Sequence, residues 1–282
     1  MKHILLISTA LALGFAGSAA AAETAVPVAP FTWTGCYVGA NAGAASLNPA
    51  WPRTSSFDAG RSGGAALLPG GFDSVSFSRG DDFNFNAIGG VAGGQVGCNW
   101  QTRMLVLGFE GEGYWSSLKQ NTGNANIPLP DNFTGFTNNW QVRNKSDADI
   151  AMRFGFAIDR ALLFGKVGYA WGDFGFNHAT LANDGVNRVS FAETANTTLG
   201  GILLGVGAEY AFAPNWTVKL EYDYIKFETK NLTFTGSTTA AGPGGNGTIG
   251  YTWRQSVSAD KQIVKVGVNY LFNWVPIWGP II

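Results

Sequence analysis

The sequence predicts an all-β protein, an eight-stranded antiparallel transmembrane β-barrel with short periplasmic turns and four long extracellular loops. Eight segments alternate apolar and polar residues, and the polar stretches between them are alternately long and very short, behind an export signal. Charged residues make up 13% of the chain and hydrophobic residues 46%, whereas a soluble domain carries about 25% charge. After the export signal no apolar run reaches helical spanning length, so the apolar residues are expected on one face of many strands.

The amino terminus has the layout of a secretory signal peptide. A short basic start precedes an apolar run at residues 4–17. Ala20 and Ala22 predict cleavage before Glu23, and the alternatives Ala19 and Ala21 would shift the cut slightly. The run is shorter than the roughly 20 residues that a spanning helix needs. The predicted organisation is a cleavable signal peptide at residues 1–22, a short periplasmic segment at 23–32, the barrel at 33–272 and an apolar tail at 273–282.

The first three predicted strands lie at residues 33–46, 85–100 and 105–115. Apolar residues recur at alternate positions along one face of each, which is the period of a strand with two different faces. Their apolar positions are Cys36, Val38, Ala40, Ala42 and Ala44, then Ile88, Ala92, Val96 and Cys98, then Leu105, Leu107, Phe109 and Trp115. Glu110 and Glu112 fall on the other face of the third strand and are expected in the lumen, because carboxylates facing lipid are costly.

The next three strands are predicted at residues 147–158, 163–171 and 198–212. Their apolar faces consist of Ile150, Met152, Phe154, Phe156 and Ile158, then Leu163, Val167, Tyr169 and Trp171, then Ile202, Leu204, Val206, Ala208 and Tyr210. The opposite faces carry the charged residues Asp149, Arg153, Lys166 and Glu209. These four side chains are therefore expected inside the barrel.

The last two strands are predicted at residues 216–224 and 264–272. Their outward positions are Trp216, Val218, Leu220, Tyr222 and Tyr224, then Val264, Val266, Val268, Tyr270 and Phe272. Their inward positions include Lys219, Glu221, Asp223, Lys265 and Asn269.

Connection lengths predict how the barrel is oriented. Short turns are expected at residues 101–104, 159–161 and 213–215, and long structureless loops near 47–84, 118–146, 177–197 and 228–258. Long loops of outer-membrane barrels face outward and short turns face the periplasm, so both termini are expected in the periplasm. Aromatic residues near both ends of the predicted strands match the two interfacial girdles of such barrels. A soluble β-sandwich would leave the export signal and this loop asymmetry unexplained together.

Two segments carry a resemblance to a known family. The sequences WTGCYVGANAG at residues 33–43 and GGVAGGQVGCNWQ at 89–101 resemble the opening hairpin of the outer-membrane immunogenic protein group within the porin-like β-barrel family. Residues 109–112 and 216–227 extend the resemblance over nearly the whole mature chain. It implies an eight-stranded barrel like the OmpA membrane domain, in abundant surface antigens that help to maintain the cell envelope.

The last strand resembles an assembly signal. Lys265, Gly267, Tyr270 and Phe272 match the polar, glycine, hydrophobic and aromatic pattern by which the barrel-assembly machinery recognises a closing strand. The chain departs from that pattern because residues 273–282 continue past the aromatic residue that normally ends it.

The inward charges allow two interpretations. Glu110, Glu112, Asp149, Arg153, Lys166, Glu209, Lys219, Glu221, Asp223 and Lys265 are expected either to neutralise one another as a plug or to line a narrow ion path. Eight strands enclose a space that side chains can fill, and the mixture of signs favours the plug.

Cys36 and Cys98 lie near the turn ends of neighbouring predicted strands and share outward parity. If they face each other, Asn41 lies opposite Gly93, and a cross-strand disulfide is sterically allowed. The alternative is two small apolar residues that happen to be thiols. An exported protein meets an oxidising compartment, which is compatible with the bond.

Nothing in the sequence predicts a catalytic centre, a cofactor or a metal site. The mature chain has one histidine, His178, which is expected to be a solvated loop residue, and a Cys/His cluster is absent. The net charge of −1 gives no reason to expect nucleic acid as a partner.

The sequence therefore predicts a monomeric barrel of the outer membrane with a structural and surface-interaction role, and a narrow porin is the alternative. Its expected partners are outer-membrane lipid and lipopolysaccharide, the barrel-assembly machinery during biogenesis, and an external ligand bound through the loops.

Overall fold

The computed structural model describes residues 31–50, 55–58, 87–122, 135–183, 188–242 and 245–272. The predicted signal peptide, most of the 23–32 segment and the 273–282 tail lie outside these residues. The described part of the chain contains no helix long and apolar enough to cross a membrane.

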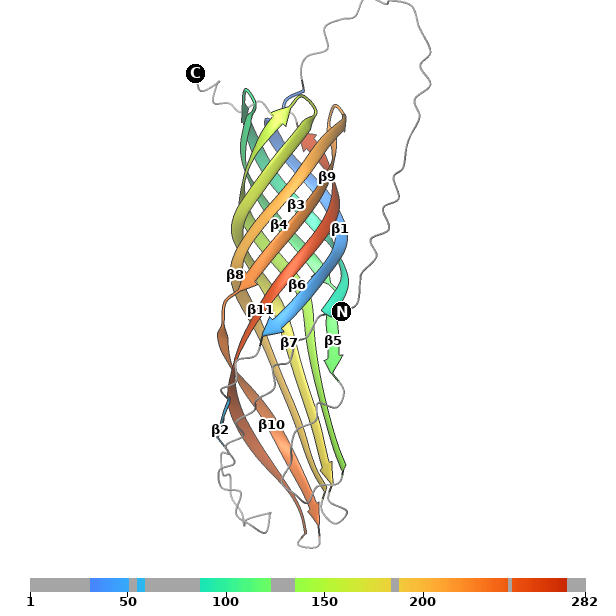
Figure 1. The fold of residues 1–282 in the computed structure, drawn as a ribbon, viewed down its shortest axis with the longest axis vertical. Coiled ribbons are helices and arrows are strands. Elements are labelled where there is room, and N and C mark those ends of the chain that lie inside the picture. Colours follow the sequence, from blue (N-terminus) through green and yellow to red (C-terminus); the bar gives the residue numbers. More distant parts are fainter. Residues whose placement is uncertain are drawn as a thin grey trace, which may run out of the picture. The chain divides into compact units, whose positions relative to one another are not determined.

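Eight long strands close into a ring in which all neighbours are antiparallel (Figure 1). Around the ring they are β1 (Gly35–Ala50), β3 (Ala87–Thr102), β4 (Leu105–Ser116), β6 (Gly135–Ile158), β7 (Ala161–Asn183), β8 (Arg188–Ala213), β9 (Trp216–Phe227) and β11 (Gly245–Phe272). The first and last strands pair with each other, from Cys36 opposite Phe272 onward. Closure satisfies the backbone groups that an open sheet would expose at its edges. The predicted eight-stranded barrel is confirmed.

The three short turns lie where the sequence predicts them. Each leaves two residues between strands, at positions 103–104, 159–160 and 214–215. Arg103 and Asp159 have positive φ values of 56° and 49°, in the left-handed region that a tight two-residue connection between antiparallel strands uses. We call the end of the ring that carries these turns the turn end, and the opposite end the loop end.

Several strands are longer than the sequence predicts. Segments expected as structureless loops contain β5 (Lys119–Thr122) and the start of β6, the end of β7 and the start of β8, and the hairpin of β10 (Lys230–Gly242) with the start of β11. The short β2 (Ser55–Asp58) pairs with β11. These strands extend the sheet past the loop end of the ring (Figure 1). The expectation was wrong because strands beyond the membrane have no uniformly apolar face, so their sequence lacks the hydrophobic period of two.

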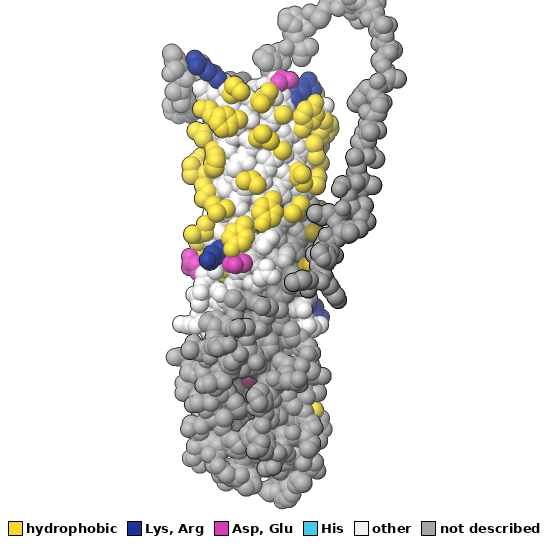
Figure 2. All heavy atoms as spheres, viewed as in Figure 1, with side chains coloured by type: hydrophobic (Ala, Val, Ile, Leu, Met, Phe, Trp, Pro, Cys, Tyr) yellow, Lys and Arg dark blue, Asp and Glu magenta, His cyan; other side chains and the backbone are white. Residues whose placement is uncertain are grey.

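The wall of the ring alternates as predicted. Exposed large apolar side chains recur at every second position, as in Leu107, Phe156 and Val206, each about three-fifths exposed. On the face drawn in Figure 2, hydrophobic side chains cover the ring, and charged side chains gather at its two rims. This apolar belt is the surface that lipid would contact.

Candidate functional site: the lumen

The interior of the ring is the candidate site, because every charge that the sequence predicts to face inward lies there. All ten of these side chains are at most 5% exposed. Short side chains on the wall leave room for the long ones: Lys166 lies opposite Gly205, and a β carbon at Gly205 would collide with Asp223 and fall 2.7 Å from Lys166 Cγ.

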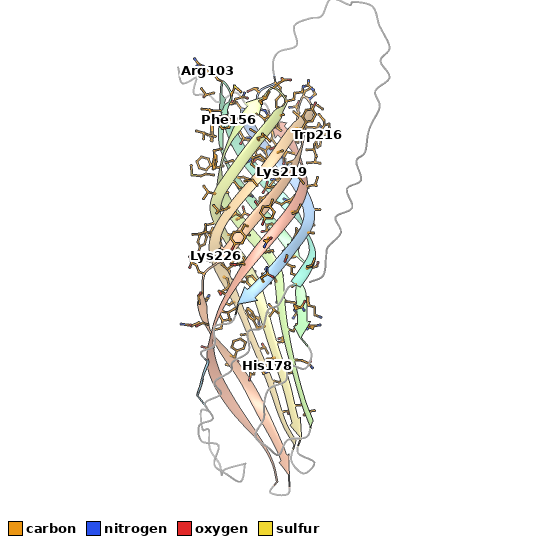
Figure 3. The ribbon with its side chains drawn as sticks, in the orientation of Figure 1. Arg103, Phe156, His178, Trp216, Lys219 and Lys226 are labelled. Atoms are coloured by element: carbon orange, nitrogen blue, oxygen red, sulfur yellow. A yellow bond between two sulfur atoms is a disulfide. The ribbon has the colours of Figure 1, made fainter. Side chains whose placement is uncertain are left out.

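Lys219, on the part of β9 within the ring (Figure 3), contacts three carboxylates of the charged layer. Its Nζ lies 3.1 Å from Glu110 Oε2, 2.9 Å from Glu112 Oε1 and 2.9 Å from Glu221 Oε2. Oxygen atoms of these three carboxylates lie within 4.8 Å of one another, a spacing that could hold a metal ion. The ammonium group of Lys219 contacts all three residues of this group, so a side chain of the protein already supplies its positive charge.

Lys166 and Lys265 join Asp223 to this centre. Lys166 Nζ lies 3.0 Å from Glu112 Oε2, 2.5 Å from Glu221 Oε1 and 3.4 Å from Asp223 Oδ2. Lys265 Nζ lies 3.2 Å from Glu221 Oε1 and 2.8 Å from Asp223 Oδ2, and it also contacts Glu112. Because four strands contribute these five residues, the network ties opposite parts of the ring together.

Arg153 holds the network on the side of the turn end. Its guanidinium lies 2.7 Å from Glu209 Oε2 and 3.4 Å from Glu110 Oε2, and it donates a hydrogen bond of 2.5 Å to the hydroxyl of Tyr37. That hydroxyl donates in turn to Glu110 at 2.7 Å. Glu209 also accepts hydrogen bonds from Thr217 at 2.5 Å and from the Asn269 amide at 2.7 Å.

A second ion pair lies toward the loop end. Lys261 Nζ is 2.6 Å from Asp147 Oδ2 and donates to Asn144 Oδ1 at 2.7 Å. Sequence reasoning missed this pair, because residue 261 falls outside the predicted last strand and residue 147 marks the start of the predicted fourth strand. Extending the period of two backward from Lys265 through Ile263 to Lys261 would have found it.

Apolar side chains lie on both sides of the charged layer. At the turn end, Trp33 packs with Val106, Ala157, Leu162 and Phe164. At the loop end a larger cluster includes Leu199, Leu203, Ile225, Ile263, Phe174, Phe176, Phe227 and Phe234. Figure 1 places the elements of this second cluster around the mouth of the ring and in the extension beyond it.

Trp33 corrects the predicted start of the first strand. The strand begins at Gly35, and the fully buried Trp33 precedes it inside the turn end. The Trp33 indole donates to the carbonyl of Asp159 at 3.2 Å, and its backbone N–H donates to Gln101 Oε1 at 2.7 Å. Within a strand, alternation alone determines whether a side chain faces the lumen or the outside. Trp33 precedes the strand, so its position depends on contacts that exist only in the folded ring.

His178 is not a solvated loop residue. It lies on β7 in the extension (Figure 3), directly opposite Glu193 of β8. Its side chain is buried, with Nδ1 3.1 Å from Glu193 Oε2. The expectation was wrong because the segment was taken for a loop.

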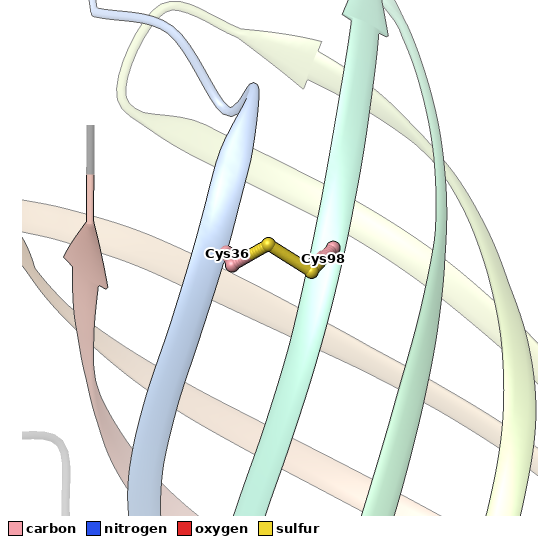
Figure 4. Close-up of a disulfide and its surroundings, with 2 residues drawn as sticks. All are labelled: Cys36 and Cys98. Atoms are coloured by element: carbon pink, nitrogen blue, oxygen red, sulfur yellow. A yellow bond between two sulfur atoms is a disulfide. The ribbon is translucent and has the colours of Figure 1, made fainter. Parts of the chain in front are cut away.

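Cys36 and Cys98 are joined by a disulfide between β1 and β3 (Figure 4). They are direct partners in the register, which also sets Asn41 opposite Gly93. Their side chains share the outward parity of Val38 and Val96. The bond therefore links two neighbouring strands on the outer face of the wall and does not enter the lumen.

The four residues of the expected assembly signal lie on the closing strand. Lys265 and Gly267 face the lumen, and Tyr270 and Phe272 face outward at the turn end. The Tyr270 ring packs edge to face on Trp216 and on Phe272, with centroid separations of 5.1 Å and 5.2 Å. Phe272 is thus part of an aromatic cluster at the rim where the barrel closes.

A closed antiparallel barrel with an apolar outside and a charged inside defines an integral protein of the outer membrane. The chain belongs to the outer membrane protein beta-barrel domain family, whose model matches residues 7–272. It is 32% identical to the 31 kDa outer-membrane immunogenic proteins of Brucella melitensis and Brucella suis, over 96% of this chain and 100% of each relative.

Solved structures of low sequence identity are also similar. The outer membrane protease OmpT of Escherichia coli matches with a TM-score of 0.40 and 12% identity, over 88% of this chain and 100% of that protein. The attachment invasion locus protein Ail of Yersinia pestis, solved with the heparin analogue sucrose octasulfate, matches with a TM-score of 0.36 and 9% identity, over 84% and 100% of the two chains.

Proposed function

We propose that this protein is a closed structural barrel that strengthens the outer membrane and displays a surface outside the cell. The observation that carries the proposal is the stacking of buried side chains along the lumen: an apolar layer, a layer of paired charges and a second apolar layer. An apolar constriction resists hydration, and paired buried charges resist separation, so this stack opposes the passage of ions.

The orientation follows from connection lengths. Short turns of outer-membrane barrels face the periplasm, so the extension that includes β10 would face the outside and both termini the periplasm. The extended strands would carry the contacts of the protein with an external ligand or with lipopolysaccharide. The ring itself needs no second copy to satisfy its edges, which supports a monomer.

Single-channel recording in a planar lipid bilayer tests the closed lumen. The folded protein is expected to give no conductance steps. A variant with residues 231–256 replaced by a short turn, which removes Leu232 and Phe234 from the outer apolar layer, is expected to stay silent because the charged layer remains.

A narrow ion pore is the competing function, and the same recording distinguishes it. Reproducible steps from the unaltered protein, with an ion selectivity that changes in Lys219→Gln, would establish a channel and reject the plug. If the unaltered protein shows no conductance steps and the shortened variant does, the apolar cluster at the loop end alone would be what blocks ion passage.

A further inference from the structure

We propose that the lumen binds one divalent metal cation through the carboxylate of Asp149, beside Glu112. The site would lie in the charged layer on the side nearer the loop end. The site is separate from the proposed closure of the lumen, because a metal ion can bind there whether or not the lumen conducts ions.

The first observation is an imbalance of charge. The charged layer contains six carboxylates, from Glu110, Glu112, Asp149, Glu209, Glu221 and Asp223, and four cations, from Arg153, Lys166, Lys219 and Lys265. The pair of Lys261 and Asp147 is neutral by itself. A formal excess of two negative charges therefore lies among side chains that are almost fully buried, where uncompensated charge is strongly unfavourable.

The second observation is the isolation of Asp149. It lies directly opposite Glu112 in the pairing of β4 with β6, so two carboxylates face the lumen side by side. Like charges at directly opposed positions of a sheet destabilise it. Glu112 is matched by Lys166 at 3.0 Å and Lys219 at 2.9 Å, whereas the closest cation to Asp149 among the described residues is Lys166 at 4.0 Å.

Asp149 also lacks hydrogen bonds. Its side chain is 2% exposed, and neither carboxylate oxygen accepts a hydrogen bond within the described part of the chain. Buried polar atoms are normally satisfied, so an exception of this kind points to a bound water or ion.

Another buried oxygen in the same layer is unsatisfied. The hydroxyl of Tyr114 has no hydrogen-bond partner among the described residues. Tyr114 is on β4 two residues from Glu112, with its side chain on the same inner face. Carboxylate and hydroxyl oxygens are ligands that calcium and magnesium prefer, and calcium tolerates irregular coordination better.

A single divalent ion would balance the charge, whereas protonation would have to occur at two carboxylates. Protonation of Asp149 alone would remove one of the two excess charges and leave the other buried. One divalent cation bound to Asp149 would neutralise both.

Metal analysis and thermal unfolding test the site in the full-length folded protein, purified in a zwitterionic detergent without chelator. About one equivalent of calcium or magnesium per chain is expected after exhaustive dialysis against metal-free buffer. After removal of metal with a chelator, adding calcium chloride should raise the unfolding temperature saturably, by roughly 5–10 °C at about a hundredfold excess over the dissociation constant.

Asp149→Asn provides the decisive variant, and Asp173→Asn is the matched control, because Asp173 is an exposed carboxylate outside the lumen. Asp149→Asn should contain no metal and lose the calcium response, while Asp173→Asn should keep both. Absence of metal and of any calcium response in the unaltered protein would overturn the proposal. So would an infrared carbonyl band of a protonated carboxylic acid that disappears in Asp149→Asn, because it would place a proton where the metal is proposed.

Discussion

At the scale of single residues, parity along a strand determined which side chains are inside. Each of the ten charged residues predicted to face the lumen does so, because a period of two assigns a face without knowledge of the rest of the fold. Parity does not predict which of these side chains contact one another. Lys219 contacts Glu110, Glu112 and Glu221 because the folded ring brings their strands close together. The pattern along a single strand carries no information about distances between strands across the lumen.

Arg153→Met is expected to destabilise the barrel by about 3–5 kcal/mol, because it leaves Glu209 buried without its cation. Arg153→Lys keeps the positive charge but loses the planar guanidinium that contacts several partners at once, so it should lower the free energy of unfolding by less. Urea unfolding in detergent micelles, followed by tryptophan fluorescence, measures both. Equal stability of Arg153→Met and the unaltered protein would mean that this pair contributes nothing to the fold.

At the scale of elements, the sequence predicted the membrane part of each strand and missed the long continuations of β6, β7, β8 and β11. β7 and β8 run about ten residues or more past their predicted ends, paired with each other from Ala161 opposite Tyr210 to Asn183 opposite Arg188. Within the membrane, lipid imposes an apolar outer face. Beyond it water contacts the strands, so backbone hydrogen bonds hold them together and leave no hydrophobic pattern to read.

The closing strand β11 yields a prediction about assembly. Phe272→Ser removes an exposed ring from the aromatic cluster at the closing rim, together with the last aromatic position of the expected assembly signal. The amount of folded protein in the outer membrane should fall several-fold, as measured by the heat-dependent shift of the folded band on gels. Phe212→Ser, another exposed aromatic at the turn end but on β8, is the control and should leave the amount nearly unchanged.

At the scale of the whole molecule, a strand pairing and a disulfide link distant parts of the chain. The antiparallel pairing of β1 with β11 joins the ends of the barrel, and the disulfide ties β1 to β3 across 62 residues of chain. The connection between these two strands, residues 51–86, is the longest in the ring. Cross-linking a long connection restricts the unfolded chain more than cross-linking a short one.

Removal of the disulfide should therefore lower stability without changing the fold. Cys36→Ser with Cys98→Ser is expected to cost up to about 4 kcal/mol by the chain-entropy argument, while the barrel keeps its heat-modifiable folded band. A thiol assay on the denatured, unreduced protein should find no free thiol. Two free thiols per chain would mean that the bond does not form in the cell envelope.

The sequence by itself determined the number of membrane strands, the face on which the residues of the predicted strands lie, the short turns and the register expected if Cys36 and Cys98 pair. These features follow from the order of apolar and polar residues along the chain, from the lipid that contacts the outer wall, and from the short distance between paired strands. Only the tertiary structure decided the layered filling of the lumen, the insertion of Trp33 at the turn end and the isolation of Asp149 beside Glu112. These arise because ring closure brings distant residues within contact, and burial then makes each missing partner costly.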